Sequence, residues 1–208
     1  MVRVLEIKTV IEHPWHIVAL AFFNKYTPGN PHVAHIQAYD ILRRVYDGQR
    51  GILSTTRLAL KNGKIPAWGR SFMPKAQAYV VEASQVDRNQ RTMTTITHNL
   101  THKTLMNVEE RQTFSVHPEN PNWTVVSTEA HISSGIGYGL SGRVEAFGYS
   151  SFQRSAERAR QALAHTILNH FNTATETAET AAMFAPSGGA KTSPAAAAAS
   201  SSLASPSS

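Results

Sequence analysis

The stretch RTMTTITHNLTHKTLMNVEERQTFSVHPENPNWTVVSTEAHIS, residues 91–133, decides the fold. It contains three runs in which polar and apolar side chains alternate, at residues 91–100, 105–116 and 123–133. Alternation with a period of two is typical of a β-strand with one buried face. The connections between the runs are short, so the three strands are expected to form an antiparallel meander.

The residues on either side extend this pattern. Four further strands are expected upstream, at residues 2–11, 33–45, 52–60 and 76–86. A short helix is expected after the first of them, beginning at Pro14 and ending at a Pro- and Gly-rich cluster. Downstream, residues 143–171 repeat apolar side chains at steps of three to five, which predicts an amphipathic helix about 42 Å long. The order indicates an α+β helix-grip architecture, in which a curved seven-stranded antiparallel sheet and a long C-terminal helix enclose a cavity.

The composition changes near residue 172. Residues 173–208 are rich in Ala, Ser and Pro, and such a segment cannot bury enough apolar surface to offset its ordering entropy, so it is expected to be a disordered tail. The whole chain has 20 Lys and Arg against 14 Asp and Glu, a net charge of +6. In the tail only Glu176, Glu179 and Lys191 are charged. The excess positive charge therefore belongs to the expected domain, residues 1–172.

The composition also excludes several classes of function. The chain has no cysteine, which excludes disulfides, thiolate nucleophiles, Cys-ligated zinc and iron–sulfur clusters. No apolar run approaches the roughly 18 residues that a membrane helix needs, and the first residues resemble neither a secretory signal nor an Arg-rich transit peptide. The ten histidines lack metal-ligand spacing, and no basic and aromatic signature indicates RNA binding. We therefore expect no metal, no cofactor and no nucleic-acid partner.

Two motifs are discounted. Residues 137–142 have the spacing G-x-G-x-x-G, but a dinucleotide site needs a buried parallel strand before it and another after it. The preceding strand alternates and no further strand follows, so we interpret the segment as a glycine hinge. Glu109 and Glu110 are adjacent on an expected strand, so they point to opposite faces and cannot act as a paired acid and base.

Several short motifs occur together in the order and spacing of one known family. They are His13-Pro14-Trp15, Ala21-Phe22-Phe23-Asn24-Lys25-Tyr26, Pro31-His32-Val33, Thr55-Thr56-Arg57-Leu58, Lys61-Asn62-Gly63-Lys64-Ile65-Pro66-Ala67-Trp68, Asn99-Leu100-Thr101, Val108-Glu109-Glu110 and Ser133-Ser134-Gly135. Each motif is short, but their order and spacing together are specific. On these residues the chain resembles the PRELI family of phospholipid carriers of the mitochondrial intermembrane space.

The resemblance implies a START-like fold, with a lid at about residues 65–76 that offers Trp68 and Phe72 as apolar contacts. It also implies one phospholipid in the cavity with its headgroup inside, and a heterodimer with a small twin-Cx9C chaperone. Transient contact with anionic membranes and residence in the intermembrane space are further implications, and no catalysis is expected. Residues 22–23 and 61–68 look most like the branch that carries phosphatidic acid for cardiolipin synthesis, whereas residues 117–121 look more like the phosphatidylserine branch.

Burying a phosphate requires compensating cations, and the resemblance points to particular ones. The candidate headgroup-binding residues are Lys25, His32, Lys61, Lys64, Arg154 and Arg158. From the sequence alone, Lys25 could equally be a favourable charge at a helix C-terminus. The two arginines are one turn apart on the expected long helix. Serines at 151 and 155 stand where some relatives have lysine and asparagine.

Three alternatives stay open at this point. The first is a phosphatidylserine carrier of the same fold. The second is a helix-grip enzyme or cyclase, which would need an acid–base pair inside the cavity. The third is a basic scaffold or nucleic-acid binder, which would bind polyanions in general without any dependence on acyl chains.

Overall fold

The computed structural model describes residues 2–63, 65–66, 76–135 and 141–183. The chain divides into two compact units, Met1–Thr173 and Ala174–Ser208. The first unit contains all the strands described below. Within the described ranges, no helix is both long enough and apolar enough to cross a membrane.

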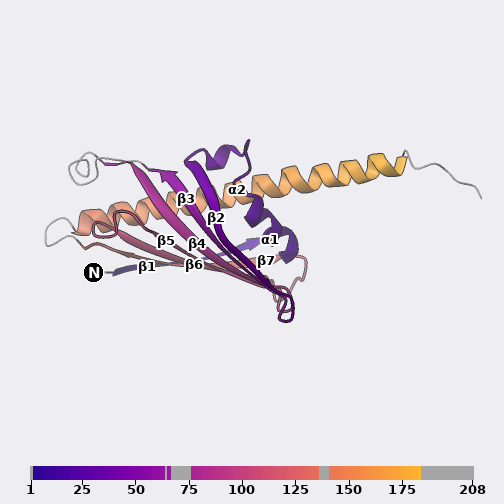
Figure 1. Ribbon diagram of the computed structural model, residues 1–208, viewed down its shortest axis with the longest axis horizontal. Helices are drawn as coiled ribbons and strands as arrows, with labels where there is room; N and C mark the ends of the chain where they lie inside the picture. Colours follow the sequence, from indigo (N-terminus) through magenta and orange to yellow (C-terminus); the bar gives the residue numbers. More distant parts are fainter. Residues whose placement is uncertain (1, 64, 67–75, 136–140, 184–208) are drawn as a thin grey trace, which may run out of the picture. The chain divides into compact units, whose positions relative to one another are not determined.

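Seven antiparallel strands form one sheet in the order β1-β7-β6-β5-β4-β3-β2, as Figure 1 shows. The strands are β1 Val2–Ile11, β2 Ile36–Asp47, β3 Ile52–Asn62, β4 Gln77–Asp87, β5 Thr92–Asn99, β6 Asn107–Val116 and β7 Thr124–Ser133. Strands β2 to β7 form a continuous meander, and β1 pairs with β7 at the far edge. The seven-stranded antiparallel sheet predicted from the alternating pattern is confirmed.

Three helical elements accompany the sheet. Helix α1 spans Trp15–Asn24 and follows Pro14, as expected for a proline at a helix start. A 3₁₀ turn, η1, spans Pro31–Val33, where a strand was expected to begin. The Asn30 side chain accepts a hydrogen bond from the His32 backbone N–H, and this cap delays the start of β2 to Ile36.

The long helix α2 spans Ser141–Met183 and therefore ends later than the predicted residue 171. Residues 173–183 belong to this helix, although their composition had predicted a disordered tail. The physical reason is that this segment consists largely of Ala, Thr and Glu and contains no Gly or Pro to end the helix. Residues 184–208 of the expected tail lie outside the described residues, as does most of the expected hinge.

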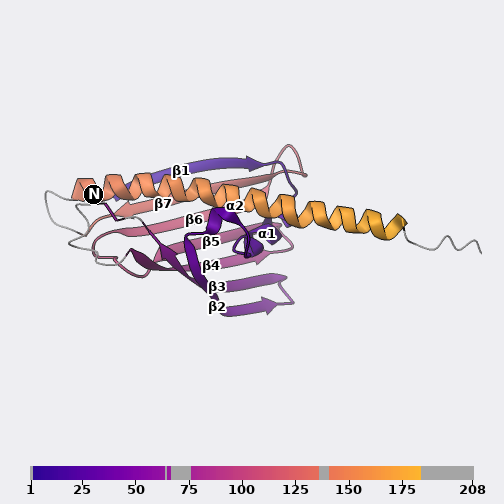
Figure 2. The ribbon, with the colours of Figure 1, turned by 90° about the horizontal axis from the view of Figure 1, so that it is seen from above.

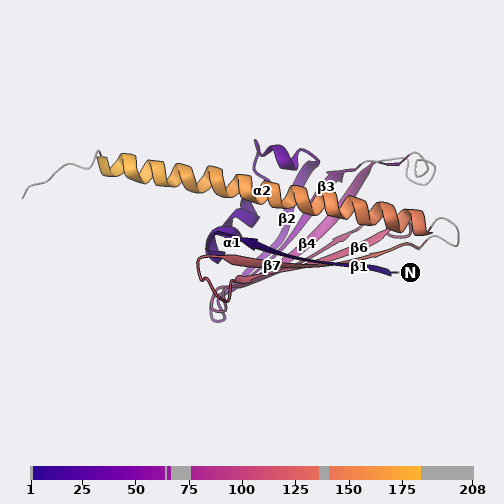
Figure 3. The ribbon, with the colours of Figure 1, turned by 180° about the vertical axis from the view of Figure 1, so that it is seen from behind.

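Both helices pack against the same face of the sheet, which we call the inner face (Figures 2 and 3). One core cluster joins Phe22 of α1, Phe114 of β6, Val126 of β7 and Leu163 of α2. A second joins Phe152 of α2 to Ala130 and Ile132 of β7, with further side chains packed around them. The predicted amphipathic helix thus lies over the sheet through its apolar side chains, which is the helix-grip arrangement.

Candidate functional site

A row of directly paired residues crosses the inner face of the sheet. Arg57 of β3 pairs with Glu82 of β4, Glu82 with Thr97 of β5, and Thr97 with Glu110 of β6. Neighbouring strands are about 4.8 Å apart, so the backbones of Glu82 and Glu110 are separated by about 10 Å. The alternation that buries apolar residues on this face therefore also places one cation and two carboxylates there.

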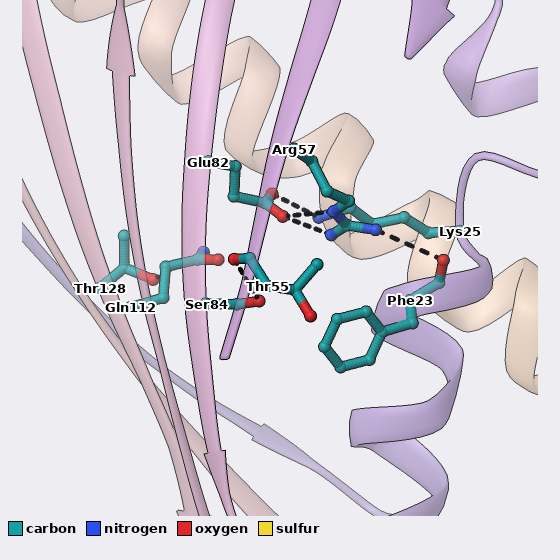
Figure 4. A network of polar contacts seen from close by, with 8 residues as sticks. All are labelled: Phe23, Lys25, Thr55, Arg57, Glu82, Ser84, Gln112 and Thr128. Atoms are coloured by element: carbon teal, nitrogen blue, oxygen red, sulfur yellow. Dashed lines mark hydrogen bonds and ion pairs between the residues drawn. The ribbon is translucent and has the colours of Figure 1, made fainter. Parts of the chain in front are cut away.

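Glu82 joins two buried cations from different elements (Figure 4). Its Oε1 accepts hydrogen bonds from Arg57 Nε at 2.9 Å and from Arg57 Nη2. Its Oε2 accepts one from Lys25 Nζ at 3.4 Å. The Lys25, Arg57 and Glu82 side chains are only 9%, 3% and 12% exposed. We call these three residues the ion cluster.

Aromatic rings at the end of α1 surround the two cations. Lys25 Nζ lies 3.6 Å from the centre of the Phe22 ring and 5.0 Å from that of Tyr26. Arg57 Cζ lies 4.9 Å from the Phe22 ring centre and 5.2 Å from that of Phe23. Cation–π attraction strengthens when water is excluded. The end of α1 and the two residues that follow it thus provide both a cation and the apolar walls around it.

The charges of the ion cluster follow from burial and from each other. Burial lowers the pKa of Lys25 to about 8, and Arg57 adds to the effect while Glu82 opposes it. Burial alone would raise the pKa of Glu82, but Lys25 and Arg57 together hold its pKa below the usual value. At neutral pH the Glu82 carboxylate is therefore ionised, and most of Lys25 remains protonated.

Lys61 and Glu110 extend the polar region beyond the ion cluster. Lys61 lines a small recess together with Tyr26, Arg57 and Glu82. Burial lowers the pKa of Lys61, and burial raises the pKa of Glu110, although each opposes the shift of the other. The inner face thus combines several cations with one carboxylate held ionised and another shifted towards its neutral form.

A cavity of about 200 Å³ is lined by Lys25 and by side chains of the sheet and of α2. Its lining is mostly apolar, with a hydrogen bond of 3.2 Å between the Gln112 and Thr128 side chains as one polar feature. The residues that line it are Ile7, Thr9, Ile11, Phe22, Lys25, Gln112, Phe114, Val126, Thr128, Gln153, Ala156, Ala159, Arg160 and Leu163. A mostly apolar space with the cation Lys25 in its lining can hold an amphiphile with an anionic headgroup.

A sequence model of the PRELI-like family matches residues 16–174. The chain belongs to this family. It is 37% identical to the chicken protein "PRELI domain-containing protein 1, mitochondrial" over 161 residues, which cover 76% of this chain and 73% of the relative. It is 34% identical to the Saccharomyces cerevisiae protein "Protein UPS1, mitochondrial" over 151 residues, which cover 72% of this chain and 84% of the relative.

Solved structures resemble this PRELI-like chain in fold alone. The Zhui aromatase/cyclase from a Streptomyces species matches with a TM-score of 0.54 at 10% identity, over 81% of this chain and 95% of that one. A protein from Thermus thermophilus matches with a TM-score of 0.51 at 13% identity, over 80% of this chain and 98% of that one. The likeness, together with the observed sheet and helix, confirms the predicted helix-grip fold class.

The structure brings only some of the predicted site residues of this PRELI-like chain together. Lys25 lies in the ion cluster and Lys61 is half-buried beside it. His32 lies on η1, where its ring meets that of His165 with 6.0 Å between centres. Lys64 and the expected lid contacts Trp68 and Phe72 lie outside the described residues.

The two predicted arginines of α2 are exposed. Arg154 donates a hydrogen bond to Ser151 Oγ at 3.1 Å, and Arg158 donates one to Ser155 Oγ at 3.3 Å. Arg160 lines the cavity, although its side chain is also exposed and forms an ion pair with Glu157. Arg158 still acts on the polar region, because burial chiefly lowers the pKa of Lys61 and Arg158 adds to that lowering.

Sequence reasoning missed Arg57 and Glu82 as site residues. Arg57 stands inside the family motif at residues 55–58, and Glu82 stands at an inward position of an alternating strand. A charged residue at an apolar position of such a strand was the available signal. The prediction that Glu109 and Glu110 face opposite sides is confirmed, since Glu109 is exposed while Glu110 lies in the inner row.

Proposed function

We propose that this PRELI-like protein transfers phospholipid, specifically phosphatidic acid, between the outer and inner mitochondrial membranes, and so supports cardiolipin synthesis. The observation that carries the proposal is a pair of buried cations, Lys25 and Arg57, of which Lys25 also lines a mostly apolar cavity. The two relatives described above are named mitochondrial, which supports the same compartment for this chain. Residence in the intermembrane space and a twin-Cx9C partner are part of the proposal.

The charge of the site favours a phosphate monoester. Lys25, Arg57 and Lys61 supply three cations, against the ionised carboxylate of Glu82. A phosphate monoester carries about −1.5 to −2 near neutral pH, and lysine and arginine are its usual partners in proteins. The phosphate of phosphatidylserine is a diester with one negative charge, and its serine adds a carboxylate together with an ammonium group that would be repelled by the same cations. Phosphatidic acid therefore fits the charge of this site better.

Transfer requires no covalent step. The carrier would dock on an anionic membrane, exchange one lipid and dissociate, with Lys25 and Arg57 holding the phosphate and the apolar cavity receiving acyl chains. Ligand cavities usually measure about 300–1,000 Å³, so a cavity of about 200 Å³ must widen to accept two acyl chains. We infer that α2 separates from the sheet when lipid enters.

The test follows fluorescent phosphatidic acid and phosphatidylserine between two liposome populations of matched charge. The full chain is assayed alone and co-expressed with a small twin-Cx9C protein. Fast transfer of phosphatidic acid, lost in Lys25→Ala and retained in the exposed control Lys103→Ala, is the expected result. Preference for phosphatidylserine would overturn the headgroup assignment. Transfer of neither lipid by the folded protein would overturn the carrier function and favour the enzyme or scaffold alternatives.

A further inference from the structure

The two buried cations already hold an anion that belongs to the protein. Lys25, directly after α1, and Arg57 from β3 both bind the carboxylate of Glu82 on β4. We propose that Glu82 is the resident anion of the headgroup site: it neutralises Lys25 and Arg57 while the cavity is empty and competes with the lipid phosphate for them, which allows the lipid to be released. This inference rests on the proposed phospholipid transfer.

Glu82 does not use all the hydrogen-bond donors of Lys25 and Arg57. Lys25 Nζ lies 3.4 Å from Glu82 Oε2, longer than the 2.7–2.9 Å or so of a strong charge-assisted hydrogen bond. An ammonium group has three donors and a guanidinium group has five. Arg57 uses Nε and Nη2 on Glu82, and Nη1 on the Phe23 carbonyl at 3.4 Å. Both cations therefore keep donor capacity that a phosphate could use.

An empty carrier needs this carboxylate. Two buried cations without a counter-ion would repel each other and would both lack hydration, which is strongly unfavourable. Glu82 removes that penalty and also draws the lysine of α1 towards the arginine of the sheet. The same carboxylate disfavours an incoming phosphate, because two like charges would then share one desolvated site. Stability of the empty state and weak retention of the lipid thus have one cause.

A carrier must bind its lipid no more tightly than a membrane does. A site with uncompensated cations would extract phosphatidic acid readily and then hold it. The Glu82 carboxylate lowers the affinity of the site for phosphatidic acid, so that the lipid can be bound and also released. On this argument, removing the charge of Glu82 raises affinity and slows transfer, which distinguishes it from removing Lys25, where both affinity and transfer fall.

The experiment compares the full chain with Glu82→Gln, which keeps the shape of the side chain and removes its charge. The control is Glu109→Gln, the same change on the exposed face of strand β6. Binding of soluble short-chain phosphatidic acid is measured by calorimetry, with short-chain phosphatidylcholine, whose zwitterionic headgroup has no net charge, as the reference. We expect about tenfold tighter binding in Glu82→Gln, slower transfer between liposomes, and no change in Glu109→Gln.

The outcomes separate this inference from the proposed function. If the unaltered protein binds no phosphatidic acid, the proposed function fails. If it binds but folded Glu82→Gln binds equally or less tightly, the resident-anion role is wrong. Glu82→Gln should melt at a lower temperature when empty, and phosphatidic acid should raise its melting temperature more than that of the unaltered protein. A variant that stays unfolded at saturating phosphatidic acid would also contradict the role, because the phosphate would then not replace the carboxylate.

Discussion

Arg57 of β3 and Glu82 of β4 lie directly opposite each other in the sheet, and one guanidinium donates two hydrogen bonds to one carboxylate oxygen. The pair is buried, and Lys25 from α1 closes it from the other side. Such an arrangement ties the helix that carries a proposed headgroup lysine to the strand that carries a proposed headgroup arginine. The interactions among Arg57, Glu82 and Lys25 therefore affect both the stability of the protein and the proposed binding of the headgroup.

The first prediction concerns the coupling of this pair. Arg57→Met should lower the free energy of unfolding by about 3–5 kcal/mol, because Glu82 loses its main partner while still buried. In the double variant Arg57→Met with Glu82→Gln, the loss should be smaller than the sum of the losses in the two single variants, since both single changes remove the same interaction. Urea unfolding of the single and double variants measures the coupling. Additive losses would contradict a direct interaction.

The second prediction is a pH dependence that comes from Lys25. Its pKa is about 8 in the folded protein, so most of its positive charge is lost between pH 7 and pH 9. Affinity for short-chain phosphatidic acid should then fall by up to about tenfold over this range. Lys25→Met should bind weakly at both pH values. An affinity in the unaltered protein that is constant from pH 7 to pH 9 would remove Lys25 from the headgroup site.

The ionisation of Lys25 affects stability in the direction opposite to its effect on affinity: stability rises with pH, whereas affinity falls. The pKa of Lys25 is lowered from 10.5 to about 8 on folding, so between these pH values the unfolded chain binds more protons than the folded one. The contribution of Lys25 to the stability of the empty protein therefore increases as the pH rises from 8 to 10.5. Urea unfolding at pH 8 and pH 10, compared with Lys25→Met, measures this contribution.

Much of the fold was predictable because it depends on local periodicity. Alternation located all seven strands, and β1 at Val2–Ile11 agrees with the predicted range. The end of α2 was not predicted, because low-complexity composition was given more weight than the absence of helix breakers before residue 184. Composition describes the average behaviour of a segment, whereas a helix continues residue by residue until something stops it.

The candidate site was predictable in part. Lys25 was singled out on family resemblance, but its partner Glu82 is 57 residues away in the chain. No local pattern connects two residues at that separation; the pairing depends on the register of β3 and β4 and on where α1 ends. Arg154 and Arg158 were predicted from a local pattern and are exposed. Helical spacing alone could not tell which side chains of α2 would face the cavity.

The third prediction concerns Asn30, which ties the end of α1 to α2. Its buried Nδ2 donates to the Lys25 carbonyl at 3.0 Å, to the Ala162 carbonyl at 3.0 Å and to Thr166 Oγ1 at 3.3 Å. Asn30→Ala should cost about 2–4 kcal/mol, because several buried groups lose a partner at once. Urea unfolding measures the loss. The control, Asn122→Ala at an exposed position between β6 and β7, should stay within about 0.5 kcal/mol of the unaltered protein.

The fourth prediction concerns Gly148, where α2 comes very close to the sheet. A Cβ atom at this position would lie 2.7 Å from Met106 Sδ and 2.8 Å from Ile132 Cγ2. Met106 can move, but Ile132 is fully buried in β7 and cannot. In a solvent-exposed helix, glycine to alanine is stabilising by up to about 1 kcal/mol. Here the overpacking should dominate, and Gly148→Ala should destabilise the protein by about 1–3 kcal/mol.

Gly142 provides the matched control for this prediction, because it lies in the same helix with nothing within 4 Å of its Cβ position. Gly142→Ala should therefore stabilise the protein slightly, by helix propensity alone. Thermal unfolding of the two variants measures the difference in sign. If both variants are stabilised, α2 does not press against β7 at Gly148 in solution. The helix would then already stand away from the sheet, and the widening that we infer for lipid entry would need no further displacement there.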